Sequence, residues 1–201
     1  MKIRQIEPHV YHVTYPTTQM LARAFFPFQE FYENVYFADT VFSREEFETW
    51  YEKTYPGQRY QDDWTGFNVP LYFIERFRKD PTLKALKESD PLSLELFEVM
   101  TYLGPDAYVI GTAEDVDPET LEHEKRHARF YRDDMYRALV SMILEDANIT
   151  ALERHLEKIS YHPKVILDEC HAYIATEEAY LREHGLWTEE FAEIRKRIKE
   201  L

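Results

Sequence analysis

The sequence has almost no cysteine, no long apolar segment and too little positive charge to balance its acids. Cys170 is the only cysteine among 201 residues, so an internal disulfide is excluded and a reducing cytoplasm is the expected location. No stretch is apolar for long enough to cross a bilayer, and the opening MKIRQIEPHVYHVTYP contains no signal-peptide core. We therefore expect a protein that neither spans a membrane nor carries a secretion signal here.

Basic residues are outnumbered by acidic ones, with 24 Lys and Arg against 38 Asp and Glu, which gives a net charge of −14. Nucleic acids and anionic membranes are excluded as expected partners, because proteins bind both through a basic field. Basic or neutral peptides and proteins are compatible with this charge. The sequence gives no indication of oligomeric state.

What the sequence does contain indicates a globular protein, since 44% of the residues are hydrophobic and 15% are aromatic. Several helices are marked by their termini. Ser43 with Glu46 forms a capping box, Asp117 precedes Pro118 at the start of another helix, and Asp133 is expected to cap the helix after that. The start and end signals predict helices from 17 or 18 to 34, 43–55, 71–79, 90–104, 117–132, 133–145, 149–160, 163–184 and 188–199.

Strand signals are fewer. Residues 9–15 alternate in the manner of a short strand, residues 108–112 (YVIGT) form the strongest strand candidate, and residues 35–42 suit a strand or an extended link. Residues 56–70 are rich in turn formers. There is no repeat and no linker. The pattern predicts a single-domain, mostly helical α+β protein.

The most informative motif is His123-Glu124-Lys125-Arg126-His127, an H-E-x-x-H sequence. On a helix, this spacing places two imidazoles on one face, where they can hold one zinc ion, with a carboxylate beside them. Its context favours a metal site, because a helix start precedes it, an apolar strand comes before that, and an acidic helix follows. No serine or cysteine lies in a nucleophile motif, so covalent hydrolysis has no support.

This segment resembles the active-site helix of the zincin superfamily of zinc metallopeptidases, in which a sheet strand precedes the H-E-x-x-H helix. The strand 108–112 occupies that place here. In the gluzincin branch a glutamate on a later helix is the third zinc ligand, and we assign that role to Glu169. The resemblance covers residues 108–178 and implies a zincin-like core with a small sheet, an H-E-x-x-H helix and a downstream glutamate helix. The other candidates for third ligand are Asp168, Asp133, Glu177 and Glu178.

Two features depart from the family pattern. Lys125 and Arg126 fill positions that are uncharged in most members, so we expect that side of the helix to reach solvent. The metzincin branch continues its motif with a glycine and a third histidine, where this chain has Phe130 and Asp133. Asp133 is therefore more readily interpreted as a helix cap than as a ligand.

The resemblance implies one zinc ion held by His123, His127 and Glu169, and hydrolysis of peptide or amide bonds with Glu124 as the general base. Tyr173 lies one helical turn after Glu169 and is expected to act at the site. The candidates for stabilising the oxyanion are Tyr173, Tyr161, His162 and His171. The alternatives are an inactive zincin-like binding or interaction protein, and a metal storage or transport protein.

Within the single domain 1–201, the expected organisation has three parts. Residues 1–104 form a mostly helical flank, residues 105–185 form the zincin-like metal-binding core, and residues 186–201 form a C-terminal helix. The flank would shape the cleft in which a peptide binds.

Overall fold

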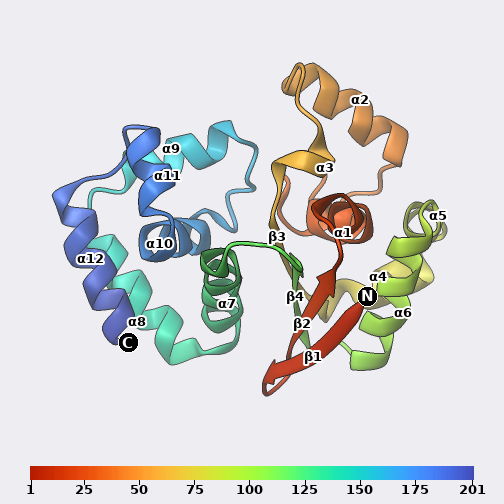
Figure 1. The fold of residues 1–201 in the computed structure, drawn as a ribbon, viewed down its shortest axis with the longest axis horizontal. Coiled ribbons are helices and arrows are strands. Elements are labelled where there is room, and N and C mark those ends of the chain that lie inside the picture. The colour runs from red at the N-terminus through yellow and green to blue at the C-terminus, as the bar shows by residue number, and fades with distance from the viewer. The chain divides into compact units, whose positions relative to one another are not determined.

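The computed structural model describes residues 1–201, with Asp63 described through its backbone alone. The chain forms two compact units, Met1–Val116 and Asp117–Leu201. The first unit, shown in red to green in Figure 1, combines a sheet with helices, and the second, in green to blue, is helical.

A mixed sheet of four strands in the order β1-β2-β4-β3 organises the first unit. Strand β4 pairs in parallel with β2 and antiparallel with β3, so it lies inside the sheet and all of its residues are buried. Its unbroken run YVIGTA suits a strand that is covered on both faces. Strand β1 pairs antiparallel with β2 at one edge and is mostly exposed. The strands are β1 (Lys2–Glu7), β2 (Val10–Tyr15), β3 (Gly66–Pro70) and β4 (Tyr108–Ala113).

Helix α1 (Thr18–Glu33) packs closely against the sheet and contacts β2, β3 and β4. Its first turn is capped by Thr17, whose hydroxyl accepts a hydrogen bond from the Met20 backbone at 3.2 Å. A Cβ atom at Gly111 would lie 2.9 Å from Leu21 Cδ1 and would overlap the ring of Phe25. Glycine at this position of β4 therefore permits the close approach of α1.

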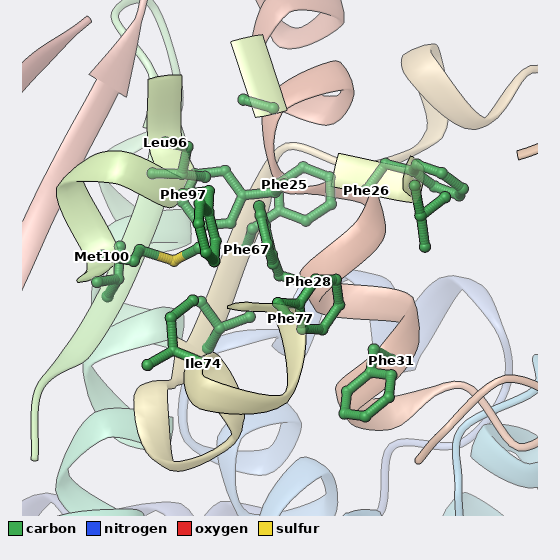
Figure 2. Packing of buried hydrophobic residues seen from close by; sticks show 14 of the residues in the cluster. Phe25, Phe26, Phe28, Phe31, Phe67, Ile74, Phe77, Leu96, Phe97 and Met100 are labelled. Carbon is green, nitrogen blue, oxygen red and sulfur yellow. The ribbon is translucent and has the colours of Figure 1, made fainter. Parts of the chain in front are cut away.

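The core of the first unit is built from aromatic rings (Figure 2). Phe28 on α1 lies 5.0 Å from Phe77 and 6.4 Å from Phe97, and Phe25 stacks on Phe67 at 5.5 Å, all between ring centroids. Such pairs stabilise by about 0.5–1.5 kcal/mol each beyond the area they bury. The other helical elements of this unit are α2 (Arg44–Thr54), α3 (Tyr60–Asp63), a 3-10 turn (Leu71–Phe73), α4 (Ile74–Lys79), α5 (Pro81–Glu88) and α6 (Pro91–Leu103).

The second unit is arranged around one central helix, α10 (Figure 1). This helix contacts each of the other five helices, and every residue in it except Leu167 is buried. Three of its buried residues are Asp168, Glu169 and His171, so charged groups lie inside the unit and require partners there. The helices are α7 (Pro118–Arg132), α8 (Asp134–Glu145), α9 (Thr150–Lys158), α10 (Ile166–Thr176), α11 (Glu178–Glu183) and α12 (Glu189–Glu200).

The prediction of a mostly helical α+β protein with a small sheet is confirmed. Four elements were not predicted, namely β1, α3, α5 and β3, of which α3 and β3 lie in the turn-rich stretch 56–70. Residues 35–39 form turns rather than a strand, and the helix predicted at 163–184 is divided into α10 and α11 at Glu177. The zincin-like core and the single-domain organisation stay predictions.

Among the described residues, no helix combines the length and the apolar character that crossing a bilayer requires.

A candidate metal centre

Two histidine side chains meet on one face of α7. The helix starts at a strong local signal, because the Asp117 carboxylate accepts a hydrogen bond from the Glu119 backbone at 2.9 Å and Pro118 occupies the first position. His123 and His127 lie one turn apart, and their Nε2 atoms are separated by 3.1 Å. The local sequence therefore determines the helix, and the helix pairs the two rings.

Glu169 on α10 completes a group of three. Its Oε2 atom lies 3.6 Å from His127 Nε2, and one ligand atom from each of His123, His127 and Glu169 lies within 4.8 Å of the others. Around a tetrahedral zinc with ligands at 2.0–2.1 Å, neighbouring ligand atoms are separated by roughly 3.3–3.4 Å. The separations of 3.1 and 3.6 Å fall on either side of that value, so the group could hold a single ion.

The outer nitrogen of each ring is already committed to a protein acceptor. His127 Nδ1 lies 3.0 Å from Asp168 Oδ1, and a carboxylate can only accept a hydrogen bond. His123 Nδ1 lies 3.0 Å from the Thr176 hydroxyl, which donates its single proton to the Ala172 carbonyl at 2.8 Å. These two oxygens therefore favour the tautomers in which each Nδ1 atom carries the proton.

In that tautomer, the Nε2 atom of each ring keeps its lone pair. The two lone pairs face one another across 3.1 Å, and the Glu169 carboxylate adds negative charge beside them. A cation, either a proton or a metal ion, is needed to make this grouping favourable. Two imidazole nitrogens and one carboxylate oxygen form a donor set that suits zinc, and a carboxylate behind a ligating histidine is the usual second partner.

Asp168 lies behind His127 and also contacts His171. Its Oδ1 atom is 3.2 Å from His171 Nδ1, and that nitrogen is 2.7 Å from the Asp168 backbone oxygen. Burial acts to raise the pKa of Asp168, but His127 and His171 outweigh it and hold the pKa below its ordinary value. Burial lowers the pKa of His171, which stacks on Phe130 at 5.0 Å. Asp168 therefore orients His127 as an ionised acceptor.

The remaining candidates for third ligand have other partners. Asp133 caps α8 by accepting a hydrogen bond from the Tyr136 backbone at 2.9 Å, as expected of a cap. Glu178 pairs with Arg182 and Arg195. Glu177 lies 3.4 Å from His123 Nδ1, on the outer side of that ring. Of the acidic candidates, the described geometry brings Glu169 into the ligand group.

Glu124 and Tyr173, the two residues expected to act in catalysis, are both buried. Glu124 follows His123 directly on α7 and is 5% exposed. The Tyr173 ring meets His123 edge to face, with 5.2 Å between centroids. Burial and then the charge of Glu169 raise the pKa of Tyr173 well above its ordinary value, although a hydrogen bond with Tyr161 acts in the other direction. The Tyr173 hydroxyl therefore stays protonated and can donate.

The other oxyanion candidates are positioned differently. His171 is directed to Asp168, and His162 accepts a hydrogen bond from the Lys164 backbone at 3.1 Å. Tyr161 is buried and hydrogen-bonded to Tyr173. The rings of Tyr173 and His171 each meet a histidine of the ligand group edge to face, Tyr173 at 5.2 Å from His123 and His171 at 6.3 Å from His127, between centroids.

Lys125 and Arg126, which lie between Glu124 and His127 in the motif, are on a partly exposed side of α7. Lys125 pairs with Glu122 at 2.6 Å and keeps 33% of its side chain exposed. Arg126 donates to the Tyr136 hydroxyl at 3.1 Å and is partly exposed. Both observations agree with the expectation that this side of the helix reaches solvent.

Sequence reasoning did not identify Thr176 as a partner of His123, or Asp168 as the acceptor for His127. A signal for Thr176 was present, because Glu169, Tyr173 and Thr176 follow the i, i+4, i+7 spacing of one helix face. No such signal exists for Asp168, because its contact depends on how α10 is rotated against α7.

Similarity to known proteins does not identify this centre. No protein-family model matches the chain, and neither does any curated protein or solved structure. The case for a metal ion is the separation of the three ligand atoms, their burial, and the oxygen atoms of Asp168 and Thr176 beside the two outer nitrogens.

Proposed function

We propose that this protein is a zinc-dependent hydrolase of peptide or amide bonds, with one zinc ion held by His123, His127 and Glu169. The observation that carries the proposal is the 3.1 Å separation of the Nε2 atoms of two rings whose outer nitrogens both lie 3.0 Å from an oxygen atom, of Thr176 and of Asp168. When bound, zinc supplies Lewis-acid chemistry, which lowers the pKa of a water molecule and polarises a carbonyl group.

Asp168 and Thr176 orient the two histidines for binding an ion. Asp168 and Thr176 keep the outer proton on His127 and His123, so both Nε2 atoms remain available. His127 is 1% exposed and Glu169 is 2% exposed, so packing against the rest of the unit restricts both side chains. The ligands therefore need little rearrangement to accept an ion.

Glu124 is assigned the proton transfers. It would accept a proton from the attacking water as the oxygen–carbon bond forms, and deliver that proton to the amine nitrogen as the carbon–nitrogen bond breaks. Its support is its place beside His123 and its burial. The protonated Tyr173 hydroxyl is assigned to donate a hydrogen bond to the carbonyl oxygen as negative charge develops there.

The proposed substrate is a peptide or protein, and the net charge of −14 favours basic or neutral sequences over acidic ones. A peptide library of mixed charge, analysed by mass spectrometry, would reveal both cleavage and this preference.

The test replaces Glu124 with glutamine and uses Glu122→Gln as the matched control. Glu122 lies on the same helix, but its side chain is 57% exposed and pairs with Lys125. We expect both variants to retain about one zinc ion per chain by elemental analysis. Glu124→Gln should lower library hydrolysis by roughly 10²-fold or more, while Glu122→Gln leaves it unchanged.

Three outcomes would contradict the proposal. Equal hydrolysis by the two variants rejects Glu124 as the base. One zinc ion per chain without any hydrolysis by the unaltered protein favours the alternative of an inactive binding protein. Several weak metal sites that are indifferent to His127→Ala would indicate metal storage or transport.

A further inference from the structure

The first unit contains a pocket that is separate from the histidine cluster in sequence and in composition. Its volume is about 400 Å³, and it is lined by residues of α1, α2, α3 and the segment between α2 and α3. Pockets of roughly 300–1,000 Å³ are typical of small-molecule sites. All the lining residues belong to Met1–Val116, so the pocket is a feature of that unit alone.

Aromatic rings form the apolar part of the pocket. Phe26 on α1 lies 4.7 Å from Phe47 on α2, Phe47 lies 5.1 Å from Tyr60, and Tyr51 lies 5.5 Å from Tyr60, between centroids. The planes of these rings are tilted or perpendicular to one another, and all four residues line the pocket. Such a lining favours a flat aromatic ligand, which gains from stacked and edge-to-face contacts.

Arg44 lines the same pocket, and its own contacts are all long. Its guanidinium lies over the Phe26 ring at 4.7 Å from the centroid. Its Nε is 3.3 Å from the Ser89 hydroxyl, while its terminal nitrogens are 3.6 Å from Glu48 and 3.8 Å from Asp90. A guanidinium bound to an anion normally makes bonds of about 2.7–2.9 Å.

The reason for these long contacts is that Asp90 is already held by another arginine. Arg23 approaches Asp90 with two nitrogens, at 2.8 and 3.2 Å, and also lines the pocket. Two guanidinium groups thus share one buried carboxylate, and Arg44 has the weaker share. An incoming anion could give Arg44 the short, paired bonds that Asp90 does not.

We propose that this pocket binds a small aromatic molecule carrying one anionic group, a carboxylate or a phosphate. The ring would lie against Phe26, Phe47 and Tyr60, and the anion would bond to the Arg44 guanidinium. Glu48 lies 3.6 Å from the same guanidinium and would compete with the ligand. The proposal is independent of the metal centre and of its assigned reaction.

The test titrates the full chain with four probes, namely benzoate, phenyl phosphate, benzamide and acetate. Calorimetry gives the Kd, and ¹⁵N-resolved NMR reports the backbone of Gly57, which lines the pocket, and of Gly185 in the other unit as a control. We expect benzoate or phenyl phosphate to bind about tenfold more tightly than benzamide and acetate. The bound anion should shift the Gly57 signal and leave the Gly185 signal unchanged. The tighter of the two anions identifies the group that the pocket takes.

Three variants test the assigned contacts. Arg44→Met should raise the Kd about tenfold or more, because a charge-assisted hydrogen bond is lost. Glu48→Gln should lower the Kd by roughly twofold, because an exposed competitor for Arg44 is removed. Arg78→Met is the control, since Arg78 pairs with Glu75 at 2.8 Å and does not line the pocket. Arg44→Lys, which keeps the charge and the stem, replaces Arg44→Met if thermal unfolding shows that variant to be misfolded.

The proposal is overturned if none of the probes binds, or if benzamide binds as tightly as both anions. It is also overturned if the Arg44 variants bind the anion as well as the unaltered chain, or if Glu48→Gln weakens binding.

Discussion

The buried histidine of the first unit and the histidine pair of the second unit are satisfied in different ways. His12 on β2 has both ring nitrogens engaged, with Nε2 at 2.8 Å from the Thr112 hydroxyl and Nδ1 at 3.2 Å from Arg4 Nη2. In His123 and His127 the outer nitrogens lie beside Thr176 and Asp168, while the inner nitrogens face each other with the Glu169 carboxylate close by. The first arrangement is complete within the protein, whereas the second brings together a group of three side chains that could hold a metal ion.

Burial of a polar residue therefore does not by itself indicate a functional site. His12 is 4% exposed and His127 is 1% exposed, yet the partners of their ring nitrogens differ. The decisive feature is two acceptor atoms that point at one another. Substitutions of a buried carboxylate, of the acid beside His127 and of the histidines themselves test this difference between the two units.

Glu30 in the first unit offers the largest expected effect. It is buried and accepts a hydrogen bond from Asn34 at 2.8 Å, and burial raises its pKa from 4.5 to about 7. Between about pH 4.5 and pH 7 the folded state holds a proton that the unfolded state has lost, so stability falls as the pH rises through this window. Raising the pH from 4 to 8 should therefore increase the free energy of unfolding of Glu30→Gln by about 3 kcal/mol relative to that of the unaltered protein.

Urea unfolding of both proteins across this pH range, with EDTA present, measures the difference directly. Because other groups titrate equally in the two proteins, only their difference is informative. A difference that stays constant with pH would show that Glu30 is ionised in the fold without penalty.

Asp168→Asn sharpens the comparison at the metal centre. The amide can still face His127, but it removes the charge that fixes the Nδ1 proton. Zinc affinity should fall about 10- to 100-fold, measured by competition with a chromophoric chelator. Asp90→Asn is the matched control, because Asp90 is buried against Arg23 instead and should leave zinc affinity unchanged. Equal zinc affinities in the unaltered protein, Asp168→Asn and Asp90→Asn would show that Asp168 does not contribute to zinc binding.

A pair of histidine substitutions gives the smallest effect. In zinc-free protein, His12→Leu should cost about 1–3 kcal/mol, because Thr112 and Arg4 lose their partner inside the fold. His123→Leu should cost less than this or even stabilise, since it removes one of the two opposed lone pairs while Thr176 keeps its bond to Ala172. Urea unfolding in EDTA compares the two. A loss in His123→Leu as large as in His12→Leu would mean that the pair is already satisfied without metal.

Much of the helical structure could be predicted from the sequence because helix ends are local. The capping box of Ser43 with Glu46 and the cap at Asp133 are present as predicted. Strand β1 was not predicted, because its residues KIRQIE are mostly exposed and show no alternation, and its pairing with β2 is what makes it a strand. Strand β3 was missed for a similar reason, since its pairing partner β4 lies far along the chain.

The same division applies to the candidate site. The spacing of His123 and His127 alone predicts that their rings share a face of α7, and the structure brings the rings together there. Glu169 could be chosen from the sequence only through the resemblance to the gluzincin branch. Asp168 and Glu169 are adjacent on α10 and point in directions about 100° apart, and the sequence does not show which of them faces α7. Only the packing of α10 against α7 determines that Glu169 meets the inner nitrogens and Asp168 the outer one.

The most direct test of the metal centre is anomalous diffraction from crystals of the full chain grown with zinc, measured on both sides of the zinc absorption edge. We predict one strong peak within bonding distance of His123 Nε2, His127 Nε2 and a Glu169 carboxylate oxygen. A map with no peak among these three side chains, while the two rings keep their hydrogen bonds to Thr176 and Asp168, would contradict the assignment.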